Sequence, residues 1–145
     1  MSTTETVLVF RVPPQPNLSR VVRDGVGAAA RGRGLREDDL QSFMTALGEA
    51  LANAMEHAKA EQPIDVEVSI TADRIVATVE DSGVGFRPLP PPEPRLPDAL
   101  AERGRGLPIM QKCSDIFAVS SRPGEGTVVV VGRYLNGRDS SAGAA

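Results

Sequence analysis

The chain has 145 residues, a length that fits one domain of ordinary size. Hydrophobic residues make up 41% and charged residues 24%, as in soluble globular proteins, and no apolar run approaches the roughly 18 residues of a membrane span. A net charge of −3 and 3% aromatic residues give no reason to expect nucleic acid as a partner. With one cysteine and no basic-then-apolar start typical of a secretory signal, we expect a cytoplasmic protein without a membrane partner.

The first third of the chain predicts a strand followed by helix. Residues 6–12 are rich in β-branched side chains and end at Pro13, which is typical of a strand. Asn17 or Ser19 can cap a helix that begins there. The glycines of residues 25–34 leave two possibilities open, a weakened helix ending near Gly32 to Gly34 or a partial loop.

The strongest helix begins at the acidic residues Glu37, Asp38 and Asp39, where the helix dipole favours negative charge. We expect it to continue to about Lys59 and to break before Pro63. Apolar residues recur along it at the three-to-four spacing of one buried face: Leu40, Phe43, Met44, Leu47, Leu51 and Met55.

After Pro63 the apolar period changes to two, which predicts strands over residues 64–70 and 75–79 with a turn between them. Residues 87–98 hold six prolines and predict a long irregular loop. A helix from about Gly106 to Ser114 and strands over 116–121 and 127–134 complete the domain.

The order of these elements argues for an α+β fold. We expect a two-layer α/β sandwich with the helices on one face of a mixed, mostly antiparallel sheet. The domain should span residues 5–135, and the small, polar residues 136–145 should form a disordered tail.

Three polar residues of the strong helix, Glu49, Asn53 and His57, are spaced four apart and share one stripe. A carboxamide oxygen can bind Mg²⁺, and a carboxylate one turn away can accept a proton from an attacking hydroxyl. Taken alone, the stripe is more simply a solvated helix face, and His57 is as easily explained by the dipole of the helix end.

Asp81 follows a strand and precedes Gly83 and Gly85. Closely spaced glycines let the backbone approach a flat ligand, and a buried carboxylate can accept a hydrogen bond from an amine such as that of adenine. An ordinary turn explains the same residues.

Two further glycine segments are ambiguous in the same way. Gly104, Arg105, Gly106 and Leu107 could bind phosphate oxygens through free N–H groups where a helix starts, or could be a linker. Residues 124–127 are most simply a hairpin turn, although the Thr127 hydroxyl could bond toward Asp81 or a base. Cys113 should pack as a small apolar side chain.

The four segments occur in a fixed order: ExxxNxxxH on a helix, DxGxG after a strand, GxG at a helix start, and GxGT before a strand. This combination resembles the Bergerat, or histidine-kinase-like, ATPase fold. Within that fold, EALANAMEHA, VEDSGVGF and GRGLPIM are similar to segments of the stand-alone anti-sigma-factor serine kinases of stress response and sporulation.

The resemblance implies roles for matching residues. Glu49 would be the general base, Asn53 the Mg²⁺ ligand, and Asp81 the reader of adenine. The nucleotide site would include these residues together with His57, Gly83, Gly85, Gly104, Arg105, Gly106, Leu107 and Thr127, and residues 87–103 would form the ATP lid.

The resemblance also implies a reaction and partners. ATP would phosphorylate a serine of an anti-sigma-factor antagonist, a sigma factor would be the other partner, and the chain would be a homodimer. Two alternatives remain open: an ATP-dependent binding module with little transfer, and a stress-signalling switch kinase that binds no sigma factor.

Overall fold

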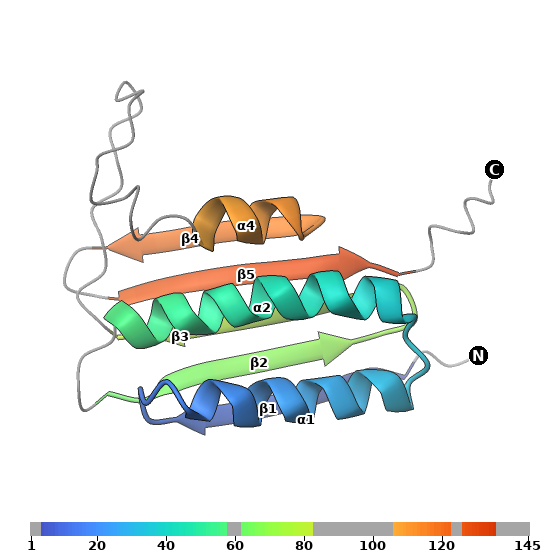
Figure 1. Cartoon of the computed structure of the whole chain (residues 1–145), viewed down its shortest axis with the longest axis horizontal. Helices are drawn as coiled ribbons and strands as arrows, with labels where there is room; N and C mark the ends of the chain where they lie inside the picture. The colour runs from blue at the N-terminus through green and yellow to red at the C-terminus, as the bar shows by residue number, and fades with distance from the viewer. Residues whose placement is uncertain (1–3, 58–61, 83–105, 123–125, 136–145) are drawn as a thin grey trace, which may run out of the picture.

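The computed structural model describes residues 4–57, 62–82, 106–122 and 126–135 (Figure 1). No helix in these ranges is both long and apolar enough to cross a membrane. The elements are β1 (Thr6–Val12), α1 (Leu18–Gly32), α2 (Glu37–His57), β2 (Ile64–Ile70), β3 (Arg74–Asp81), α4 (Gly106–Lys112), β4 (Ile116–Arg122) and β5 (Gly126–Tyr134).

The five strands form one sheet in the order β1-β2-β3-β5-β4. The four pairings are all antiparallel, so the prediction of a mostly antiparallel sheet is confirmed, and the described strands include no parallel pair. Because β5 is inserted between β3 and β4, the end of β3 lies beside the start of β5. The last residues of β3 and the first residues of β5 therefore lie together at one end of the domain.

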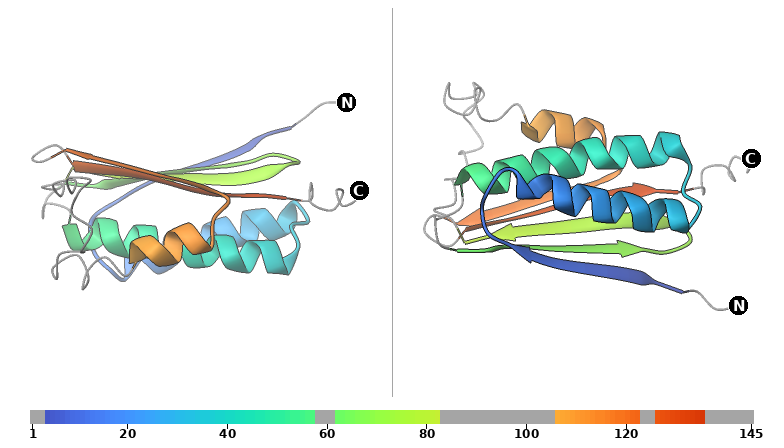
Figure 2. Two further views of the ribbon diagram at one scale, coloured as in Figure 1. Left: turned by 90° about the horizontal axis from the view of Figure 1, so that it is seen from above. Right: turned by 60° about the horizontal axis from the view of Figure 1, so that its bottom comes forward.

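The helices cover one face of this sheet, as the left view of Figure 2 shows. The alternation in β2 and β3 explains this arrangement, because every second side chain of these strands is apolar and buried. The predicted stripe on α2 packs against that face, although Met44 and Met55 are only partly buried. The largest buried side chains are Phe43, Leu40, Leu47, Leu51, Ile64, Ile70, Ile75, Met110, Val22, Val26, Val66 and Val68.

The boundaries of two helices refine the sequence predictions. α1 continues through its glycines to Gly32, so the helical alternative is correct there. Asn17 occupies the position before α1, but its side chain makes no capping hydrogen bond, so that part of the prediction is wrong. α4 ends at Lys112, two residues before Ser114, and Cys113 packs partly buried against the core as predicted.

Two predicted boundaries are not tested. α2 reaches His57, and its predicted extension to Lys59 lies outside the described residues. The tail over residues 136–145 also lies outside them, so the domain limits remain a prediction.

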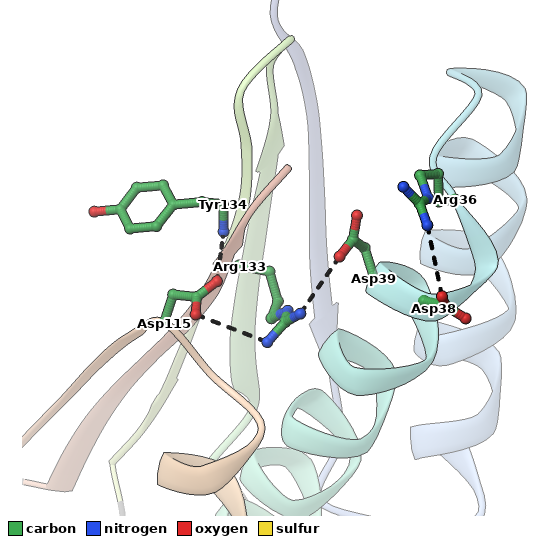
Figure 3. A network of polar contacts seen from close by, with 6 residues as sticks. All are labelled: Arg36, Asp38, Asp39, Asp115, Arg133 and Tyr134. Carbon is green, nitrogen blue, oxygen red and sulfur yellow. Dashed lines mark hydrogen bonds and ion pairs between the residues drawn. The ribbon is translucent and has the colours of Figure 1, made fainter. Parts of the chain in front are cut away.

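Arg133 joins three elements at the end of the molecule where α2 begins (Figure 3). Arg133 belongs to β5. Its guanidinium lies 3.4 Å from a carboxylate oxygen of Asp39 in the first turn of α2, and 3.7 Å from a carboxylate oxygen of Asp115, which follows α4. Asp115 also accepts a hydrogen bond of 2.9 Å from the N–H of Tyr134. The Asp39 side chain is only 11% exposed, so its charge depends on this neighbour more than a surface carboxylate would.

We expect Arg133→Met to lower the free energy of unfolding by about 2 kcal/mol, because it leaves the nearly buried carboxylate of Asp39 without the adjacent positive charge. Arg36→Met is the matched control. Arg36 and Asp38 are separated by 3.7 Å but are 64% and 86% exposed, so this change should cost less than about 0.5 kcal/mol. Urea denaturation of both variants measures the difference, and equal losses would show that the Arg133 contacts contribute no more than a surface pair.

Candidate functional site

The candidate site lies at the other end of the domain, where the last turns of α2, the end of β3 and the start of β5 come together (Figure 1). α4 begins on the side of this same end. Because the sheet is antiparallel and β5 is inserted next to β3, residues more than 40 positions apart become neighbours here. The order of the strands in the sheet therefore brings the residues of this site together.

Three polar residues stand in one row across three strands, and we call them the Asp81 row. Asp81 on β3 pairs in register with Thr127 on β5, which in turn pairs with Ser121 on β4. Asp81 is 5% exposed and Thr127 is 2% exposed. The hydroxyl oxygens of Thr127 and Ser121 are 3.0 Å apart and share a hydrogen bond.

The Asp81 row faces the helix layer. Asp81 alternates with the buried Val79 and Ala77 along β3, and Thr127 alternates with the buried Val129 along β5. A carboxylate and two hydroxyls thus lie at one end of a sheet face whose other buried side chains in β3 and β5 are apolar. Such a group can orient a polar ligand that enters between sheet and helices.

Gly126 fixes the approach of β5 to Asp81. Its φ is +99°, and a Cβ atom at this position would lie 2.0 Å from the backbone oxygen of Asp81. Only glycine fits this conformation and this distance. This close approach of Gly126 accompanies the pairing of Thr127 with Asp81. Gly124 and Glu125 of the predicted turn lie outside the described residues.

The polar stripe of α2 borders the buried face of the helix. Glu49, Asn53 and His57 are each partly buried, and Ala50 and Ala54 beside them are fully buried. These side chains are therefore not on a fully solvated face, which was the simpler interpretation of their spacing. A carboxylate and a carboxamide held one turn apart on a rigid helix can act together on one ligand.

The remaining predicted site residues are described only in part. Gly83, Gly85, Gly104, Arg105 and the predicted lid lie outside the described residues. Gly106 and Leu107 form the first turn of α4, which agrees with the predicted helix start.

The residues present suit a Mg²⁺ ion that is held mainly by phosphate oxygens and water, with one protein oxygen. The described part of the chain has no cluster of three or more acidic, histidine or cysteine side chains that could hold a metal by themselves. Mg²⁺ commonly binds through one or two protein oxygens together with phosphate oxygens and water. The carboxamide of Asn53 can supply such an oxygen.

Sequence reasoning missed Ser121. Its partner Thr127 was identified, but the pairing depends on the register of β4 against β5. The register of two paired strands depends on the geometry of the turn that connects them. A turn segment with two glycines allows more than one turn geometry and therefore more than one register. No motif in the sequence marked this serine.

A cavity of about 340 Å³ lies away from these residues, near the start of α2. Its lining contains no predicted site residue, and it includes the guanidinium-bearing Arg33 and Arg36 as well as Asp39. Arg33 already donates hydrogen bonds to Thr4 and Thr6, and Arg36 is paired with Asp38. We therefore assign the candidate site to the Asp81 end and not to this cavity.

Comparison with known proteins shows which family the chain is similar to. The family of the histidine kinase-like ATPase domain matches residues 12–132. A serine-protein kinase RsbW of Bacillus velezensis is 30% identical over 147 residues, covering 94% of this chain and 91% of that protein. An anti-sigma F factor of Clostridium perfringens is 31% identical over 107 residues, covering 68% and 75%.

Solved structures show the same fold. The RsbU and RsbW domains of Rv1364c from Mycobacterium tuberculosis match with a TM-score of 0.66 at 17% identity, over 90% of this chain but 32% of that one. The histidine kinase domain of a blue-light activated kinase from Erythrobacter litoralis matches with a TM-score of 0.56 at 19% identity, covering 88% and 64%. The predicted fold class and family are thus confirmed, and the chain belongs to the histidine kinase-like ATPase domain family, within its anti-sigma-factor serine kinases.

Proposed function

We propose that this chain is an ATP-dependent protein-serine kinase that phosphorylates an anti-sigma-factor antagonist and binds a sigma factor. Its relatives are named serine-protein kinase and anti-sigma F factor, which supports both halves of the proposal. The observation that carries it is the buried Asp81 row, at the same end of the domain as the polar stripe of α2. A cytoplasmic location is also part of the proposal.

The Asp81 row would bind the base of ATP. A buried carboxylate accepts a hydrogen bond from the exocyclic amine of adenine, and Thr127 supplies a hydroxyl beside it. Gly126 keeps the two residues at backbone contact. Asn53 would bind Mg²⁺, which neutralises charge on the phosphate oxygens. The further nucleotide contacts in this proposal are His57, Gly83, Gly85, Gly104, Arg105, Gly106 and Leu107.

Glu49 would be the general base. Its carboxylate lies one helical turn before Asn53 and is partly buried, so it is held near the proposed phosphate end of the site. As the serine oxygen of the antagonist bonds to the γ-phosphorus, the bond from that phosphorus to the β-phosphate oxygen breaks and ADP leaves. The hydroxyl proton passes to Glu49.

Phosphotransfer by the Glu49→Gln variant tests this role. We expect transfer from labelled ATP to the antagonist captured with the tagged chain to fall at least about 100-fold, because general-base catalysis contributes about that much. The affinity for ATP should change less than about 3-fold. Glu56→Gln, on an exposed position of the same helix, is the matched control and should keep wild-type transfer.

Three other results would change the proposal. Equal labelling by wild type and Glu49→Gln would show that Glu49 is not the base. ATP binding without labelling by either protein would favour the regulatory binding module. An antagonist that is labelled, captured from cells without any sigma factor, would favour the switch kinase.

A homodimer is also part of the proposal. No described element covers the sheet face opposite the helices (Figure 2), and Val9, Tyr134 and Val7 are 71%, 51% and 48% exposed. On that face β3 carries Arg74 at one end and Glu80 at the other, so a twofold axis across the strands would bring opposite charges together. Sedimentation at the mass of one chain at micromolar concentration would contradict the dimer.

A further inference from the structure

Ser121 is the member of the Asp81 row to which no role has been assigned. It lies on β4, opposite Thr127, and its hydroxyl oxygen is 3.0 Å from that of Thr127. Ser121 is partly buried, whereas Thr127 is almost completely buried. On its other side, Thr127 is paired in register with Asp81. Thr127 therefore stands between a hydroxyl and a carboxylate.

The hydrogen-bonding capacity of Thr127 makes this arrangement directional. A threonine hydroxyl has a single proton and two lone pairs, so it can donate only once. If Ser121 donates to Thr127, the Thr127 proton is available on the side of Asp81. When a base is bound beside Asp81, that one proton can be donated to an acceptor atom of the base, while the Asp81 carboxylate accepts from a donor of the base.

We infer that Ser121 is a positioning residue that holds the Thr127 hydroxyl as a donor toward the Asp81 side of the site, and that it thereby contributes to the selection of adenine. This inference rests on the proposed ATP site. Adenine offers an amine donor and an adjacent ring-nitrogen acceptor on one edge. A carboxylate beside a hydroxyl donor is the complement of that pattern.

Hypoxanthine, the base of ITP, reverses both groups, because it carries a carbonyl oxygen and a ring N–H on the same edge. The Asp81 carboxylate would then face a carbonyl, and a Thr127 donor would face another donor. Without Ser121 the Thr127 hydroxyl is free to turn and accept from that N–H. Losing Ser121 should therefore weaken ATP binding while leaving ITP binding unchanged or improved.

The backbone allows the hydroxyl to be removed cleanly. Ser121 is paired to Thr127 through the antiparallel ladder, which alanine preserves. The adjacent Ser120 is exposed, points to the opposite face and pairs with Val128. Ser120→Ala is thus a control with the same chemical change on the same strand.

The test is calorimetric titration of ATP and ITP into wild type, Ser121→Ala, Ser121→Thr and Ser120→Ala. We expect Ser121→Ala to weaken ATP binding about 5-fold, the usual effect of one hydrogen bond, and to change ITP binding less than 2-fold. The preference for ATP over ITP should fall accordingly. Ser121→Thr keeps the hydroxyl and should restore the preference, and Ser120→Ala should match wild type.

The outcomes separate the inference from the proposed function. Equal weakening of ATP and ITP by Ser121→Ala would mean that Ser121 only supports the structure, and unchanged binding of both would mean that its hydroxyl has no role. Either result overturns the inference while wild type still binds ATP. A wild-type protein that binds no ATP overturns the proposed function and the inference with it.

Discussion

Replacing Gly126 by alanine is expected to lower the free energy of unfolding by more than about 3 kcal/mol and to abolish ATP binding. The added Cβ would lie 2.0 Å from the Asp81 oxygen and 2.8 Å from the Cα of Ser82, far inside contact distance. Both obstacles are backbone atoms, at the last residue of β3 and the residue after it, and cannot rotate away. The φ of +99° adds conformational strain for any L side chain.

Gly32→Ala provides the control for this prediction. Gly32 is the last residue of α1, and a Cβ there meets no atom within 4 Å. Alanine should leave stability unchanged or raise it by up to about 1 kcal/mol, because it favours helix. Thermal and urea unfolding with calorimetric ATP titration measures both variants. A Gly126→Ala protein as stable as Gly32→Ala would contradict the close contact between β5 and Asp81.

The sheet was predictable because each of its strands carries a local signal. The alternation of Ile64, Val66, Val68 and Ile70 with polar residues predicts a half-buried strand, and the structure buries all four. The stripe on α2 was equally clear, since helical spacing is also a local property. Both predictions are correct because burial in the core stabilises the same elements that the local apolar pattern favours.

The extent of α1 depended on contacts that the sequence does not contain. Glycines lower helix propensity, which made a partial loop a fair alternative for residues 25–34. In the fold, Gly25 lies against the ring of Phe10, and a Cβ there would come within 3.2 Å of it. The small residue thus lets α1 pack closely on β1, and tertiary packing outweighs local propensity.

The residues of the candidate site also fall into two groups, those that a local sequence pattern marks and those that only the fold reveals. Asp81 and Thr127 stood out because glycines mark them, and Glu49 and Asn53 because helical spacing does. Ser121 has no marker, since its partner is set by strand register. The contact between Arg133 and Asp39 joins residues 94 positions apart, and no local pattern could predict it. Sequence identified residues on single elements, whereas the contacts between elements required the fold.

Asp81→Asn is expected to weaken ATP binding by about 10- to 100-fold, the effect of losing one hydrogen bond to a charged group. The change preserves the shape of a side chain that is 5% exposed, but it replaces one acceptor oxygen by an NH₂ donor. Whichever way the carboxamide turns, the negative charge that strengthens a bond from the adenine amine is gone. Calorimetric titration of ATP measures the loss.

Glu80→Gln is the appropriate comparison, because Glu80 is the adjacent residue on β3 but is exposed on the opposite face of the sheet. It makes the same change in net charge and should leave the affinity for ATP within about 2-fold of wild type, since exposed charges contribute little. If both variants lose affinity equally, the effect of Asp81 is one of overall charge. If Asp81→Asn binds ATP like wild type and melts at the same temperature, Asp81 does not contact the base. A loss confined to Asp81→Asn would place the base at the end of β3, because among the described strand residues Asp81 is the buried carboxylate, and it lies beside Thr127 on the face toward the helices.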